Sequence, residues 1–425
     1  MQATLLAAMA KLALDQAPVV SLPRRFLLSM PPWGMLAGVL LLVDGDALLR
    51  SRWHPGTLAL VHAYTLGVLG NAMFGSLLQF LPAAAGVRLR GVRLGAYLHG
   101  LFNAGALALV FGLRQGSHVA LLAAALALPT AFAMLAGMTV PGLLQASLQR
   151  LLRAGIGMSL AFGSIVGLLG ATLALARAGY FPIRLPALVD VHASWGIAGW
   201  VLLLLVSVSG VVMPMFQGTR VPSARHLATW LVALPLLLSA AAAWRLGRDD
   251  AGGMCVVLAS CALAFGVGVL GLQRRTPSSR RGPLWWSWRG GAAALVLSAL
   301  AFGVGNRYQM GAAVLALGGA LPVLVVGMAL EIVAFLGWID LHRRVGRGVQ
   351  LPGVQRLMPS RDRSAGLLAL AAAALLLVAA TLYPVAWLAR AAGLALCAAW
   401  LVVGLMFIGV RWRTRRFLIT AGVRT

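Results

Sequence analysis

Two histidines, His62 and His192, lie inside apolar runs that are long enough to cross a lipid bilayer. A polar side chain in such a run needs a partner, because an unpaired polar group is costly inside a membrane. Neutral imidazole is a strong ligand for transition metals and for haem iron. If the two runs face each other, the two imidazoles can bind one iron from both sides, which gives a six-coordinate, low-spin centre suited to electron transfer. The alternative is that each histidine hydrogen-bonds to a neighbouring helix.

Two glycines follow His192 on the same predicted helix face. Gly196 and Gly199 come at i+4 and i+7, and residues at these spacings lie above one another on a helix. Missing side chains on that face would leave a slot for a flat macrocycle, so both glycines are candidate packing residues for a haem. Glycines also let membrane helices approach each other closely, and this purely structural interpretation stays open.

Two further polar residues, His99 and Glu331, interrupt apolar runs. His99 has Asn103 at i+4, and it is a candidate ligand for a second metal or haem, or a proton relay. The simpler interpretation is a hydrogen bond to a neighbouring helix. Glu331 is the only carboxylate well inside an apolar run, which makes it a candidate for a proton path. It could instead pair with Arg343 or Arg344 at the end of the run.

The composition indicates what kind of molecule must position these residues. The chain has 425 residues, of which 61% are hydrophobic and 10% charged, and its mean hydropathy is +0.91. Such values exclude a soluble domain and predict an all-α, polytopic membrane protein. The net charge of +26 comes from arginines in short loops, where lipid headgroups can neutralise them, so the predicted partner is the bilayer and not nucleic acid. The three cysteines show no C-x-x-C spacing, which argues against a disulfide framework and a thiolate metal site.

Windows of about 20 residues predict twelve spans in a single integral membrane domain, 1–425. The predicted spans are 26–44, 56–82, 94–113, 117–138, 154–176, 188–215, 227–244, 252–273, 288–306, 311–338, 364–386 and 391–410. With these spans, 26 Lys and Arg fall on the side of the amino terminus and nine on the other side. The positive-inside rule then places both termini in the cytoplasm. The remaining histidines lie at or beyond span ends and receive no ligand role: His54, His118, His226 and His342.

Spans two, six and ten run in the same direction. This puts His62 and His192 at similar depth, within about two turns of the outer surface. The inner halves of these spans also align, with 75–82 matching 207–214 and 327–334. A similarity that recurs every four spans predicts a threefold repeat of four-helix units. Span ten has no histidine.

The pattern resembles the haem-copper oxidase subunit I superfamily and, within it, the NnrS-like group of oxidase-related proteobacterial membrane proteins. The resemblance lies in the twelve spans, in His62 followed by a glycine-rich helix that ends in Leu81-Pro82, and in His192 leading to the run Met-Pro-Met-Phe-Gln-Gly at 213–218. It implies an inner-membrane protein of bacteria in which His62 holds a low-spin b haem. His192 becomes the second axial ligand by similarity of pattern, since the family places that ligand on span ten.

The family's copper centre uses a histidine and a tyrosine at four-residue spacing and an adjacent histidine pair, and this sequence has neither. Oxygen reduction is therefore not expected. The resemblance implies a protein that binds haem b and, as a second option, copper through His62, His192 or His99. Such a protein would serve electron transfer, a nitric-oxide response or metal handling, with a respiratory-chain or cytochrome partner.

Two functions of other classes remain as alternatives. In a haem-free multi-pass permease, the histidines and Glu331 would line a substrate or proton path among the spans. A respiratory assembly factor would need no cofactor. An absorption spectrum separates the first function from both alternatives.

Overall fold

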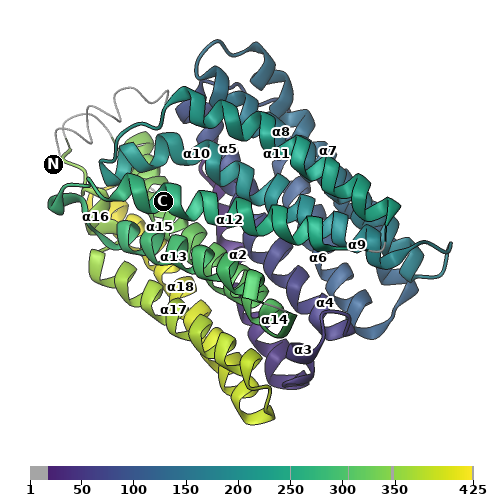
Figure 1. Ribbon diagram of the computed structural model, residues 1–425. Helices are drawn as coiled ribbons and strands as arrows, with labels where there is room; N and C mark the ends of the chain where they lie inside the picture. The colour runs from purple at the N-terminus through teal and green to yellow at the C-terminus, as the bar shows by residue number, and fades with distance from the viewer. Residues whose placement is uncertain (1–17, 249, 305, 346–348, 424–425) are drawn as a thin grey trace.

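The computed structural model describes residues 18–248, 250–304, 306–345 and 349–423. Within these residues the chain is helical and contains no strand (Figure 1). Twelve helical segments are long and apolar enough to cross a membrane, as predicted. The chain is therefore an all-α, multi-pass membrane protein.

Nine of these spans are essentially continuous α-helices: α2 (Ser21–Asp44), α6 (Gly95–Gln115), α7 (His118–Gln145), α8 (Arg150–Arg177), α11 (Ala224–Gly247), α12 (Gly252–Gln273), α13 (Pro283–Val304), α17 (Ser360–Leu382) and α18 (Ala386–Thr420). The other three are composite. Span two consists of α4 (Pro55–His62), η2 (Ala63–Gly70) and α5 (Asn71–Ala85). Span six consists of α9 (Leu185–Ser194), η4 (Trp195–Leu202), α10 (Leu203–Val212) and η5 (Met213–Gln217). Span ten consists of α14 (Asn306–Val314), η7 (Leu315–Ala320) and α15 (Leu321–Arg344). Short helices lie in the connections: α3 (Ala47–Arg50), η3 (Val92–Leu94), η6 (Ser278–Arg280) and α16 (Val354–Leu357).

The predicted number and order of spans are confirmed, and most helix ends lie only a few residues from the predicted limits. The last helix differs most, because α18 continues to Thr420, well beyond the predicted end at 410. Its extra turns carry the run Arg-Trp-Arg-Thr-Arg-Arg at 411–416, which a hydropathy window rejects. Arginine is nevertheless a good helix former, so the helix does not stop where the apolar run stops.

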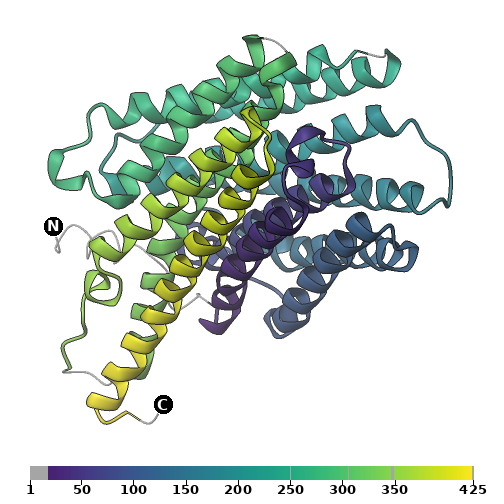
Figure 2. The same cartoon turned by 90° about the horizontal axis from the view of Figure 1, so that it is seen from below.

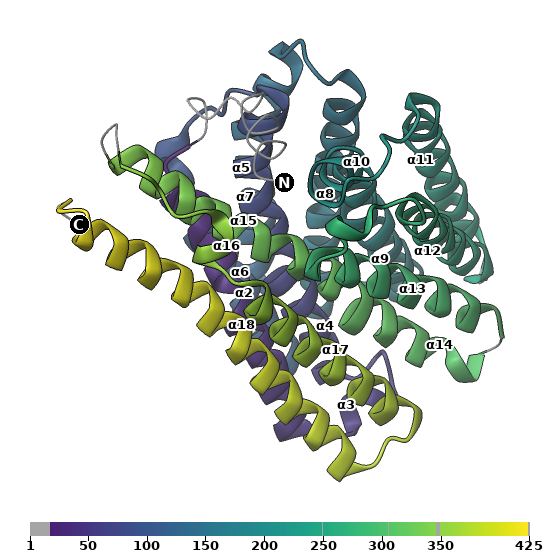
Figure 3. The same cartoon turned by 90° about the vertical axis from the view of Figure 1, so that its left-hand side faces the viewer.

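The molecule has two faces, because consecutive spans alternate in direction. We call the face at which α2 begins and at which α5, η5, α15 and α18 end the basic face. We call the opposite face, at which α4 and α9 begin, the histidine face. Figure 3 shows α3 near the turn between α17 and α18 at the histidine face, and α3 and α17 are in contact there.

Spans two, six and ten share a local irregularity that supports the predicted repeat. Each contains a π-helix, η2, η4 or η7, and each π-helix begins twelve residues before the first residue of the aligned segments, Gly75, Ser207 and Gly327. A π-helix holds an extra residue in its turn, is rare, and occurs often at functional sites. Three such turns in the same register indicate three related four-helix units.

The first two spans of each unit also approach each other at these aligned residues. A Cβ on Gly75 would lie 2.9 Å from the Pro23 carbonyl oxygen of α2. Ser207 of α10 occupies the space that a side chain on Gly155 of α8 would need, and Ser287 of α13 faces Gly327 of α15 in the same way. Small residues let membrane helices pack closely. The same pairing of spans therefore recurs in all three units.

The last span closes the bundle against the first. Figure 2 shows α18, in yellow, running beside α2, in purple, and the two helices are in extensive contact. Spans two and six are the most enclosed, with 78% and 72% of the residues in their apolar segments buried. The two histidines therefore lie on the two most enclosed helices of the described structure.

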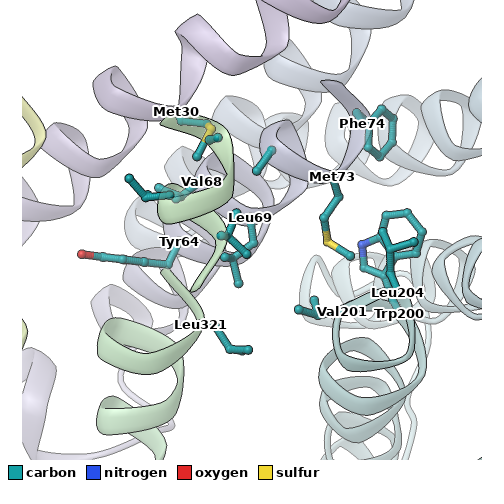
Figure 4. Packing of buried hydrophobic residues seen from close by; sticks show 14 of the residues in the cluster. Met30, Tyr64, Val68, Leu69, Met73, Phe74, Trp200, Val201, Leu204 and Leu321 are labelled. Atoms are coloured by element: carbon teal, nitrogen blue, oxygen red, sulfur yellow. The ribbon is translucent and has the colours of Figure 1, made fainter. Parts of the chain in front are cut away.

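An aromatic cluster joins the first two units on the basic side of the histidines. The ring of Phe74 lies 4.4 Å from Phe102 and 5.2 Å from Phe132, measured between centroids, and Phe132 lies 5.7 Å from Trp200. Figure 4 shows Met73 of α5 pointing toward Trp200 of η4. Dense packing of this kind leaves little freedom for spans two and six to shift against each other.

Candidate functional site

The two histidines hold equivalent places on their spans. His62 is the last residue of α4 and lies seven residues after Pro55, and His192 lies seven residues after Leu185 near the end of α9. At 1.5 Å per residue, both lie about 10 Å along the helix from the histidine-face end. A π-helix follows each of them, η2 directly and η4 after two residues. The predicted similarity in depth is present in the structure.

The structure brings the two imidazoles together. Their ring centroids are 6.2 Å apart and their planes differ by 25°. This contact joins span two of the first unit to span six of the second. The pair that the sequence singled out is thus a pair in space.

A hydrogen bond orients the His62 ring, and the His192 ring is held by packing against α8. Nδ1 of His62 lies 2.7 Å from the Leu58 carbonyl oxygen, one turn earlier, and donates its proton there, which leaves Nε2 with its lone pair free. Nδ1 of His192 is buried and has no hydrogen-bond partner among the described residues. The His192 ring lies against α8, where a Cβ on Gly170 would be 3.0 Å from Cε1. Each imidazole therefore keeps one nitrogen available as an acceptor.

The spacing of the rings matches a shared metal ion. A metal–nitrogen bond of about 2 Å on each side, with roughly 1 Å from each nitrogen to its ring centre, places the two centroids about 6 Å apart. A direct N–H···N bond would bring them to about 5 Å, whereas offset stacking places ring centroids about 4.5–7 Å apart. The observed 6.2 Å agrees with a shared metal ion and with offset stacking, and it is too long for a direct hydrogen bond between the rings.

The donor set favours haem over a bare ion. The described residues contain no group of three or more His, Cys, Asp and Glu side chains that could hold a metal ion together. Zinc sites use three or four protein ligands, so two imidazoles leave coordination positions that the protein does not fill. A porphyrin supplies the equatorial nitrogens and leaves two axial positions for protein ligands. The number of imidazoles in the pair fits those two positions.

The side chains around the pair leave accessible surface. His62 and His192 are partly exposed as whole residues although their helices are the most enclosed spans, and Leu58, Leu66 and Gly196 are partly exposed as well. The nearest atom to a Cβ on Gly196 would be Val166 Cγ1, at 3.5 Å. The described side chains therefore do not fully cover this part of spans two and six.

Gly199 has a different environment from the one expected. A Cβ on Gly199 would lie 2.6 Å from the ring of Phe162 on α8, and that ring in turn packs edge-on against Trp195, with centroids 5.2 Å apart. Phe162 therefore takes the space in which Gly199 was expected to receive a macrocycle. In the structure Gly199 lets α8 approach η4 closely.

Comparison with known proteins adds no relative. No protein-family model matches the chain, and no curated protein matches it.

His99 lies apart from the pair, near the basic face. Its Nε2 is 2.8 Å from the Ser29 hydroxyl of α2, and its ring packs edge-on against Phe26, with centroids 4.9 Å apart. Asn103, one turn further along α6, accepts a hydrogen bond of 2.7 Å from Trp33 and exchanges hydrogen bonds with Asn71. These contacts agree with the simpler interpretation of His99 as an interhelical hydrogen-bonding residue. Its role as a metal ligand stays a prediction.

Glu331 forms a buried ion pair with an unexpected partner. Nη1 of Arg363 on α17 donates to Oε1 of Glu331 at 2.5 Å, and the two residues are 2% and 9% exposed. Arg344, one of the expected partners, pairs instead with Asp340 at 3.0 Å. Nε and Nη2 of Arg363 have no hydrogen-bond partner among the described residues. The predicted span 364–386 began one residue too late to include Arg363, which is why sequence reasoning missed it.

Asp190, which was expected to pair with Arg184, forms an ion-pair group with two other arginines near the histidine face. Asp190 lies two residues before His192. Its Oδ2 accepts a hydrogen bond of 2.9 Å from Nε of Arg245, and its Oδ1 lies 3.0 Å from Nη1 of Arg52. Arg245 is 8% exposed and Asp190 is 7% exposed. The group ties the start of α9 to α11 and to the loop after α3. The polar position of Asp190 inside span six was the available signal, but its partners are far away in the sequence.

Proposed function

We propose that His62 and His192 are the two axial ligands of a b-type haem and that the chain is an electron-transfer protein of the membrane. The observation that carries this proposal is the 6.2 Å separation of two nearly parallel imidazoles on the two most enclosed spans. The absence of a third protein ligand among the described residues favours a macrocycle over a bare metal ion. Copper is the second option, in which the pair would bind the ion without a porphyrin.

The chain's own residues would set the properties of the centre. The Leu58 carbonyl accepts a hydrogen bond from Nδ1 of His62 and so fixes the orientation of the ring. This bond also makes the lone pair on Nε2 a stronger ligand for iron. The haem, when bound, supplies reversible one-electron chemistry. Two imidazole ligands favour the low-spin state, in which little structural change accompanies electron transfer. The aromatic cluster of Phe74, Phe132 and Trp200 keeps the basic side of the site apolar.

The place of the pair near the histidine face suggests where an electron partner docks. Both histidines lie about 10 Å along their spans from this face. With the orientation predicted from the arginine distribution, this face lies outside the cytoplasm of a bacterial inner membrane and both termini lie inside. We therefore propose a cytochrome or another respiratory-chain protein as the partner. A nitric-oxide response or metal handling would use the same centre.

Haem and metal analysis of the purified chain tests this proposal. Protein expressed with ample haem should contain about one b haem per chain by pyridine haemochrome assay, with iron in equal amount and no stoichiometric copper. Copper without haem would replace the porphyrin proposal by the bare-ion option. Well-folded protein without haem or copper would contradict both.

A haem-free permease is the second candidate function, and one observation favours it. Ten buried side-chain nitrogen and oxygen atoms of the described residues lack a hydrogen-bond partner, and nine of them belong to side chains in the basic half: Gln79, Gln217, Gln273, Thr276, Trp285, Trp288 and Arg363. Buried polar atoms without protein partners usually bind water. Hydration there would give Glu331 its proposed role in a proton path. Proton uptake by reconstituted vesicles, lost in Glu331→Gln, would support this function over the first.

A further inference from the structure

A basic pocket lies at the basic face, between the start of α2 and the ends of α15 and α18. Its volume is about 250 Å³, and its lining is Arg24, Asp340, Arg344, Arg411, Thr414, Arg415 and Leu418. Thr414 and Leu418 are buried and form its floor, with exposures of 3% and 1%. The pocket belongs to neither the histidine pair nor the buried ion pair.

The charges in this pocket do not balance. Four arginines line it with a single carboxylate, Asp340, which lies 3.3 Å from Nη2 of Arg24 and 3.0 Å from Nε of Arg344. Arg411 and Arg415 are exposed, and no hydrogen bond or ion pair of theirs occurs among the described residues. Two guanidinium groups with free donors beside a cavity form a site for an anion with several acceptor oxygens, such as a phosphate.

An apolar stripe leads along α18 to the same arginines. The stripe consists of residues spaced by four, three and four positions, with exposures between 49% and 59%: Leu401, Leu405, Ile408 and Trp412. These spacings place the residues on one face of the helix. On a membrane span such a face lies against lipid acyl chains, and tryptophan is typical of the headgroup level. A ligand that fits both the pocket and the stripe therefore carries an anionic group and an acyl chain in one molecule.

We propose that this pocket binds the phosphate of an anionic phospholipid, with Arg411 and Arg415 as its principal ligands and one acyl chain along the stripe of α18. Basic pockets between membrane helices on the positively charged side of a protein are suited to such headgroups. The lipid would connect α18 with the ends of α2 and α15, the first and tenth spans. This proposal is independent of haem binding, because the pocket and the histidine pair lie at opposite faces.

The test compares two variants of the full-length chain that remove charge from the same helix. Arg411→Gln/Arg415→Gln removes the two unpaired pocket arginines. The control, Arg416→Gln, removes an arginine that does not line the pocket and packs over the Trp412 ring at 5.4 Å. Delipidated protein in neutral detergent is titrated with phosphatidylglycerol, phosphatidylcholine or inorganic phosphate, and binding is followed by native mass spectrometry.

Wild type and Arg416→Gln should bind phosphatidylglycerol in preference to phosphatidylcholine. The double variant should bind it about thirtyfold more weakly, which corresponds to about 1 kcal/mol for each arginine. If the double variant does not elute as a monodisperse protein, Arg411→Lys/Arg415→Lys replaces it and should retain the preference for the anionic lipid. Equal binding of the two lipids, or unchanged binding by the double variant, would overturn the proposal. Inorganic phosphate that binds as tightly as phosphatidylglycerol would assign the pocket to a soluble anion instead.

Discussion

The histidine half and the basic half of the bundle differ in how many of their buried polar atoms have a hydrogen-bond partner. Among the described residues, ten buried side-chain nitrogen and oxygen atoms lack a hydrogen-bond partner, and the histidine half contains one of them, Nδ1 of His192. The central polar contact of this half joins two imidazoles. The basic half holds the other nine atoms. Each half also holds one buried ion pair, Asp190 with Arg245 near the histidine face and Glu331 with Arg363 in the basic half, but only Arg363 keeps buried guanidinium nitrogens without a partner among the described residues. Both halves use the same three composite spans.

This difference teaches which half suits which chemistry. Neutral imidazoles can be enclosed at much lower cost than charged groups, so a pair of them can wait for a metal without a counter-ion. A buried guanidinium keeps its charge and needs a carboxylate and further acceptors, which water can provide. The histidine half is therefore suited to a cofactor, and the basic half to hydration and protons.

The largest expected effect is on stability and comes from breaking the ion pair in the basic half. Arg363→Ala leaves the Glu331 carboxylate buried without its partner, and we expect the free energy of unfolding to fall by about 3–5 kcal/mol. Glu331→Gln keeps an amide oxygen for the hydrogen bond from Nη1 but leaves the guanidinium charge without a counter-ion, so we expect a loss of similar size. Thermal unfolding in detergent measures both. Haem content per folded chain should not change in either variant. Loss of haem in Glu331→Gln would show that the cofactor depends on the basic half and would contradict its proposed place at the histidine pair.

A smaller effect is expected from crowding the histidine pair from α8. In Gly170→Val the new side chain meets the His192 ring, because a Cβ there already lies 3.0 Å from Cε1. We expect overpacking to cost about 1–3 kcal/mol and to displace the ring, so that haem occupancy falls or the low-spin signal broadens. The matched control is Gly157→Val on the same helix, where no atom lies within 4 Å of a Cβ. An unchanged spectrum in a folded Gly170→Val variant would argue that His192 is not a ligand.

The smallest effect is expected at His99. Ser29→Ala removes the hydroxyl 2.8 Å from its Nε2, and we expect a loss of about 1 kcal/mol, typical of one hydrogen bond. The absorption spectrum should stay that of the wild type, because His99 lies outside the pair. A spectral shift in this variant would instead support His99 as a ligand of a second metal or haem.

Much of the fold could be predicted from hydropathy and charge, because span length and arginine placement are properties of the chain in a bilayer. The shared depth of His62 and His192 followed from counting spans, and the contact between their rings agrees with it. The π-helices after these histidines could not be predicted, since an extra residue in a turn has no local signature and is stabilised by packing. The partner of Glu331 was missed because Arg363 lies outside the apolar window of its span. Likewise, only the packed structure shows that Phe162 fills the space beside Gly199.

The central claim is tested most directly by optical spectra of the oxidised and reduced protein with each histidine replaced. Wild type should show a sharp Soret band and a resolved reduced α-band, as expected for iron with two imidazole ligands. His62→Ala and His192→Ala should each lose the haem or convert it to a five-coordinate form. His226→Ala and His342→Ala, at the basic face, should leave the spectrum unchanged. Low-spin haem that persists in both His62→Ala and His192→Ala would contradict the proposed pair.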